Sequence, residues 1–107
     1  MSKPNYPDVM RYIINYAVNN LSIDETRLAL PKKVTMLDVN DNFEEVCSLL
    51  SSKHICSDFW ADELDLIELI MDLEDEFSVA IEDGEIGDNP TLEEITQAVM
   101  SGTPSDL

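Results

Sequence analysis

The segment from residue 62 to residue 77 constrains the fold most, because its apolar and acidic residues recur at helical spacing. Placed at about 100° per residue, the segment separates into distinct faces. One face is a core stripe of Leu66, Leu69, Ile70, Leu73 and Phe77. Another is an acidic band of Asp65, Glu68, Asp72, Asp75 and Glu76. We predict a long amphipathic helix that buries the first face and exposes the second.

A second apolar seam lies on the same helix. It consists of Leu64, Ile67 and Met71 and lies about 135° from the centre of the core stripe by helical geometry. Such a seam is either covered by another part of the fold or exposed as a contact for a partner. The sequence leaves both possibilities open.

Two further helices have clear signals. A helix from Pro7 to Leu21 is predicted by one apolar stripe, made of Val9, Met10, Ile13, Ile14, Ala17, Val18 and Leu21. A final helix is predicted from the capping box at 91–94, with Leu92, Ile95 and Val99 facing the core. Gly102 fits just past the end of this helix.

The connection between the first two long helices is less regular. Residues 22–40 show weak periodicity, and Pro31 breaks any continuous helix there. Residues 41–44 resemble a capping box and precede a short apolar stripe, which predicts a helix over 42–52. We therefore expect one all-α domain over 1–107, with 22–57 as an extended connection that holds an inserted helix and 101–107 as a frayed tail.

Charge is the strongest signal in the composition. The chain has 6 basic and 23 acidic residues, a formal net charge of −17. From His54 onward there are sixteen acidic residues and no Lys or Arg. This field disfavours nucleic acid and anionic membranes as partners and favours a basic protein. The alternative is that the charge serves only solubility.

No signal for an enzyme or a metal site emerges. Cys47 and Cys56 lie nine residues apart, which is not a zinc spacing, and we expect two partly buried thiols in a cytoplasmic protein. His54 has no pattern of Ser or Cys partners around it, and no glycine-rich phosphate loop exists. The acids at 82–88 lack the ligand spacing of an EF-hand. We predict no catalytic residues, no metal and no cofactor.

One motif resembles the prosthetic-group segment of a known family. The residues at 58–65, Asp-Phe-Trp-Ala-Asp-Glu-Leu-Asp, are similar to Asp-Leu-Gly-Ala-Asp-Ser-Leu-Asp of acyl carrier proteins. The stretches at 68–71 and 73–77 resemble the continuation of that motif, and the resemblance extends without a gap from Asp58 to Met100. It implies an acyl-carrier-protein-like four-helix bundle, here with an extra helix between the first helix and the motif helix.

The chain departs from the family at two positions of the motif. Glu63 occupies the position of the serine that accepts phosphopantetheine, and a carboxylate has no hydroxyl to form that phosphodiester. Trp60 replaces the small glycine of the family and adds bulk where the modifying synthase would approach. The degenerate site implies that the chain is not phosphopantetheinylated. The charge of Glu63 either imitates the phosphate of a modified serine or simply suits the first turn of a helix.

The leading hypothesis is a non-catalytic interaction protein that docks a basic partner through the acidic helix. By the resemblance, the partner would be a fatty-acid or polyketide type enzyme. The predicted contact residues are Asp62, Glu63, Asp65, Ile67, Glu68, Met71, Glu74 and Asp75. An acidic inhibitor or immunity protein that neutralises a basic toxin or nuclease is the alternative. A functional acyl carrier modified elsewhere is a third possibility.

Overall fold

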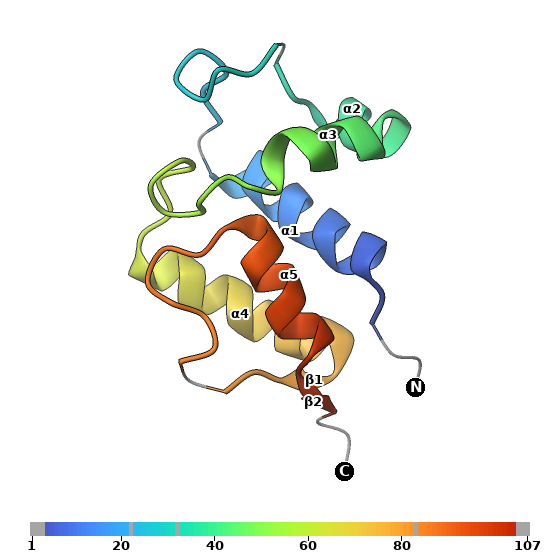
Figure 1. Ribbon diagram of the computed structural model, residues 1–107, viewed down its shortest axis with the longest axis vertical. Coiled ribbons are helices and arrows are strands. Elements are labelled where there is room, and N and C mark those ends of the chain that lie inside the picture. Colours follow the sequence, from blue (N-terminus) through green and yellow to red (C-terminus); the bar gives the residue numbers. More distant parts are fainter. Residues whose placement is uncertain (1–3, 22, 32, 83, 105–107) are drawn as a thin grey trace.

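The computed structural model describes residues 4–21, 23–31, 33–82 and 84–104, and in this part the chain forms five helices and one pair of short strands (Figure 1). The helices are α1 (Tyr6–Asn20), α2 (Met36–Asp41), α3 (Phe43–Leu50), α4 (Glu63–Phe77) and α5 (Leu92–Met100). The predicted helical bundle is therefore confirmed. None of the described helices is both long and apolar enough to cross a membrane.

Helix α1 is the centre of the bundle and packs most extensively against α5. Its start is fixed by Asn5, whose side chain accepts a hydrogen bond from the backbone N–H of Asp8 at 3.0 Å. Pro7 lies in the first turn, where a missing N–H costs nothing. The buried face matches the predicted stripe and contains Val9, Met10, Ile13, Ile14 and Ala17.

Helix α4 turns its predicted core stripe inward. Leu66, Leu69 and Leu73 are buried, and full burial of a side chain of this size stabilises a fold by about 1.5–3 kcal/mol. At the far end of the helix, the Phe77 ring meets the Tyr12 ring of α1 edge to face, with centroids 5.9 Å apart. The core of the bundle lies between α1, α4 and α5 and continues to the buried Val46 and Leu50 of α3.

The inserted segment contains two helices rather than the one predicted over 42–52. Helix α3 lies within the predicted range, but α2 precedes it and was not predicted. The predicted capping box at 41–44 does not form, because Asn42 ends α2 and makes no side-chain capping bond to α3. The capping box of this region lies at the start of α2, between Thr35 and Asp38.

Three basic side chains hold the inserted segment in place, and one of them, Arg11, belongs to the bundle. Arg11 of α1 donates to the carbonyl oxygen of Val39 at 3.2 Å and lies over the Phe43 ring, 4.3 Å from its centroid. The Lys53 ammonium donates to the carbonyl oxygen of Leu28 at 3.3 Å. Arg27 donates to the backbone of the loop that precedes α4. Figure 1 shows α2 and α3 at the opposite end of the molecule from the two strands.

The two short strands correct the prediction of a frayed tail. Strand β1 (Val79–Ala80) follows α4 and pairs antiparallel with β2 (Thr103–Pro104), which follows α5. Gly102 suits this crossing, because a Cβ there would lie only 3.1 Å from the carbonyl oxygen of Ala80, a tight contact. Residues 103 and 104 are therefore held against the bundle, whereas 105–107 lie outside the described residues.

Candidate functional site

The loop before α4, residues 54–62, contains the first five residues of the predicted motif at 58–65, and α4 begins with the remaining three. The first turn of the loop closes when the backbone N–H of His54 donates to a carboxylate oxygen of Asp58 at 2.7 Å and the N–H of Asp58 donates to the carbonyl oxygen of His54 at 2.9 Å. Phe59 is fully buried and Ala61 is nearly so. With Ile55, which is also fully buried, the loop is thus anchored in the core at three positions, and Trp60 lies at the surface between Phe59 and Ala61.

Asn89 and Pro90 hold this loop from the side of α5. The side-chain oxygen of Asn89 accepts hydrogen bonds from the backbone N–H groups of Cys56 at 3.2 Å and Ser57 at 3.0 Å. The N–H of Ile55 donates to the carbonyl oxygen of Pro90 at 2.9 Å. These bonds give the loop backbone partners that no regular secondary structure supplies.

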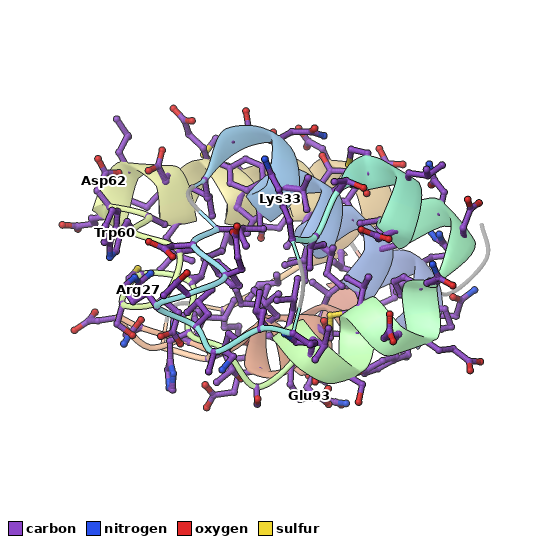
Figure 2. All side chains as sticks on the ribbon, turned by 90° about the horizontal axis from the view of Figure 1, so that it is seen from above. Arg27, Lys33, Trp60, Asp62 and Glu93 are labelled. Atoms are coloured by element: carbon purple, nitrogen blue, oxygen red, sulfur yellow. The ribbon has the colours of Figure 1, made fainter. Side chains whose placement is uncertain are left out.

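Arg27 holds the loop from the side of the inserted segment (Figure 2). Its guanidinium donates to the carbonyl oxygen of Ser57 at 3.1 Å and to that of Asp58. The same group lies over the Trp60 ring, 4.7 Å from the centroid. Arg27 therefore fixes the backbone of the loop and the orientation of the indole together.

Trp60 has a backbone conformation that normally favours glycine. Its φ is +60°, in the left-handed region, and its side chain is 62% exposed. This is the position at which the resemblance places a glycine. The loop therefore combines a glycine-type backbone with a large aromatic side chain at its surface.

The N-terminus of α4 is fixed by a reciprocal capping box. The Asp62 carboxylate accepts from the N–H of Asp65 at 2.8 Å, and the Asp65 carboxylate accepts from the N–H of Asp62 at 3.1 Å. Glu63 is the first residue of the helix and is exposed. A carboxylate at this position is stabilised by the N-terminal end of the helix dipole.

The structure places most of the predicted contact residues on one exposed surface of α4. Asp62, Glu63, Ile67, Glu68, Met71 and Asp75 are exposed. Asp65 is half-buried in the capping box, and Glu74 is half-buried because its carboxylate accepts from the N–H of Ile81 at 2.8 Å. These two residues serve the fold as well as the negative surface.

The second apolar seam is not covered by the inserted segment. Leu64 is 62%, Ile67 45% and Met71 59% exposed. Burial of apolar side chains such as these is favourable, and the folded chain alone does not bury them. An exposed row of them on one helix is therefore a candidate contact surface. The structure thus answers the question that the sequence left open, because no described part of the chain packs over these side chains.

The negative field of α4 acts on its neighbour α1. Burial, together with the carboxylates of Asp72, Glu76 and Asp75, raises the pKa of Tyr12 above its ordinary value. Burial also raises the pKa of Tyr16, with the nearest acids of α4 adding to the effect. The acids are nevertheless too dispersed for a metal, since no group of three or more potential ligands converges among the described residues.

The site does not fit a phosphopantetheine group. The first residue of α4 offers a carboxylate instead of a hydroxyl, so no phosphodiester can form there. Ser57 lies six residues earlier, with its hydroxyl accepting from the Asn89 amide at 3.0 Å, and Ser78 lies at the opposite end of the helix.

The two cysteines match their predicted environments. Cys47 and Cys56 are both partly buried free thiols. Burial, aided by Asp62, Asp65 and Asp88, raises the pKa of the Cys56 thiol, which lowers its reactivity. The His54 side chain is 45% exposed and lies 3.6 Å from the Asp58 carboxylate.

Comparison with known proteins identifies the family of this region. The family model for the phosphopantetheine attachment site matches residues 57–99. The match begins in the loop before α4 and ends within α5, and it leaves out α1, α2 and α3. A search of curated proteins and a search of solved structures each gave no match.

Proposed function

We propose that the chain is an acyl-carrier-like, non-catalytic interaction protein that docks a basic partner; the match of residues 57–99 to the phosphopantetheine-attachment family supports the carrier-like part. In this proposal the shape of a carrier is used for recognition, while the chemistry of a carrier has been lost at Glu63. No cofactor takes part.

The exposed surface of α4 is the observation that carries the proposal. The helix contains seven acidic and no basic residues, and the exposed apolar seam runs between its acids. Charges at such a surface set the association rate and the salt dependence of binding. Apolar side chains among them contribute anchoring once water is excluded. A basic partner with an apolar strip complements both.

The proposal also includes a cellular location and a class of partner. We propose a cytoplasmic location, which suits two cysteines that remain free thiols. By analogy with carriers, the partner would be an enzyme of fatty-acid or polyketide type that has a basic docking patch.

A charge-reversal experiment tests the proposal. The double variant E68K D75K changes the charge of α4 by four units without touching the core, since both side chains are exposed. Affinity capture in low salt, followed by measurement of binding to the captured protein, should show loss of binding by this variant. Binding of the wild-type chain should weaken as salt rises.

The matched control changes the same charge on a different part of the molecule. D41K E44K also reverses two exposed acids, but on α2 and α3, and it should bind like wild type. Unaltered binding by E68K D75K in low salt would contradict the proposal. Capture of a toxin or nuclease in place of a biosynthetic enzyme would instead support the inhibitor hypothesis.

A further inference from the structure

Trp60 extends the exposed seam of α4 beyond the N-terminal end of the helix. The residue lies four positions before Leu64, so the chain keeps their Cα atoms within about 14 Å of each other. Trp60 and Leu64 are each 62% exposed, and the row continues through Ile67 and Met71. Figure 2 shows Trp60 beside Asp62 at this end of the molecule. We call these four residues, Trp60, Leu64, Ile67 and Met71, the apolar row.

One face of the indole is held by a contact with Arg27. Arg27 lies over its face while its own donors are used by the carbonyl oxygens of Ser57 and Asp58. The loop is also anchored by buried Phe59 and Ala61 on either side. A large aromatic group that is already ordered loses little conformational entropy on binding, which is the property of an interface anchor.

The left-handed backbone at Trp60 indicates that this side chain is retained at a cost. A non-glycine residue with φ of +60° is strained, and such strain is concentrated at functional positions. Nothing in the core requires an indole here, because most of its surface faces water. The side chain therefore does not serve the fold alone.

The charges around the apolar row determine the chemistry of its partner. By helical geometry, Glu63 and Glu74 lie on one flank and Glu68 and Asp72 on the other. Within α4, Leu64, Ile67 and Met71 follow the spacing of a helix ridge, which a second helix complements well. A partner segment that complements the apolar row and its flanking carboxylates is an amphipathic helix with an apolar stripe between lysine or arginine side chains. A second copy of this chain would bring two strongly negative faces together.

We propose that Trp60, positioned by Arg27, is the anchor by which the apolar row binds a basic amphipathic helix of a partner protein. This inference rests on the proposed function and deepens it, because it names the structural class of the partner segment and the residue that selects it. Arg27 acts as a positioning residue, whereas Trp60 makes the contact.

The single tryptophan of the chain gives a direct test. The probe is an 18-residue Leu/Lys helical peptide with its leucines on one face. On titration, the tryptophan emission should shift to the blue and acrylamide quenching should fall, because the indole leaves water. A scrambled peptide of the same composition and a Leu/Glu peptide should produce neither change.

Variants separate the contribution of Trp60 to peptide affinity from the contribution of the acidic side chains. With a fluorescein-labelled Leu/Lys peptide, W60G should bind about tenfold or more weakly, and W60F should retain most of the affinity. R27K should bind severalfold more weakly, yet R27K W60G should be no worse than W60G, because Arg27 acts through the indole. L37A is the control, since Leu37 is 70% exposed on α2, away from the row.

Each failure has its own signature. Full affinity in W60G, with weak binding in E68K D75K, would overturn the anchor and leave the proposed function standing. Full affinity in E68K D75K would overturn the proposed function itself. A concentration-dependent blue shift without peptide would assign the row to a second copy of the chain. Protection of the indole by phosphatidylcholine vesicles but not by peptide would assign it to a lipid surface.

Discussion

The backbone at Trp60 leads to a prediction in which glycine stabilises the protein more than alanine. Both W60G and W60A remove the indole and its contact with Arg27, so they differ only in how the new residue tolerates a φ of +60°. The difference between the two variants therefore isolates the backbone conformation from the lost side-chain contacts. Each variant alone would mix the two effects.

The size of the difference follows from two opposing contributions. A residue with a Cβ loses roughly 1–2 kcal/mol in the left-handed region, whereas glycine costs roughly 0.5–1 kcal/mol more than alanine in backbone entropy. The balance leaves about 0.5–1 kcal/mol in favour of glycine. For a domain of this size, that corresponds to a melting temperature about 2–8 °C higher for W60G than for W60A.

Thermal unfolding followed by circular dichroism measures this difference. The control pair is D72G and D72A in the middle of α4, where the order should reverse and alanine should be the more stable by about 1 kcal/mol. If W60A proved as stable as W60G while the control pair behaved as stated, the backbone at Trp60 would not be left-handed. Trp60 would then carry no backbone strain that marks it as an anchor.

Three further predictions concern stability and pH. Urea unfolding should show that L69A, in the core, lowers the free energy of unfolding by about 2–5 kcal/mol, whereas L64A, at the surface, changes it by less than about 0.5 kcal/mol. Equal losses in the two variants would contradict the assigned faces of α4. Loss of the α4 cap in D62A should lower the free energy of unfolding by about 0.5–2 kcal/mol. D62S should retain most of the wild-type stability, because serine is also a good N-cap residue. Equal stability of D62A and wild type would contradict the capping box. The raised pKa values of Tyr12 and Tyr16 favour their protonated forms in the folded protein, so their contribution is complete below about pH 10 and is lost as pH rises through the folded pKa values. Between pH 9 and 11, the free energy of unfolding should therefore fall less steeply with pH in Y12F Y16F than in wild type. An identical pH dependence in the two proteins would contradict the raised pKa values of Tyr12 and Tyr16.

The long helices could be predicted because their signals are local. In α1, α4 and α5 the apolar period and the capping residues agree, so the predicted ends lie within one or two residues of the observed ones. The six residues of α2 offer too few apolar positions for a period, although the capping pair of Thr35 and Asp38 was a usable signal. Strands of two residues are too short to show alternation, which is why β1 and β2 were missed.

The candidate site was predicted only in part, for a physical reason. Helical spacing places Leu64, Ile67 and Met71 in one row, but it does not show whether another segment covers them. The contact between Arg27 and Trp60 joins residues 33 positions apart, and no local pattern indicates such a pair. The role of Asn89 in holding the motif loop is equally non-local, because its partners lie more than thirty residues earlier.

The central claim, a carrier-like fold without carrier chemistry, is tested most directly by intact-mass measurement after incubation with coenzyme A and a phosphopantetheinyl transferase. The wild-type chain should gain no mass, because Glu63 offers no hydroxyl. The variant W60G E63S, which restores the glycine and the serine of the motif at the start of α4, should gain the mass of one phosphopantetheine group. A mass gain in the wild-type chain would show that the protein is a carrier after all, and would contradict the account.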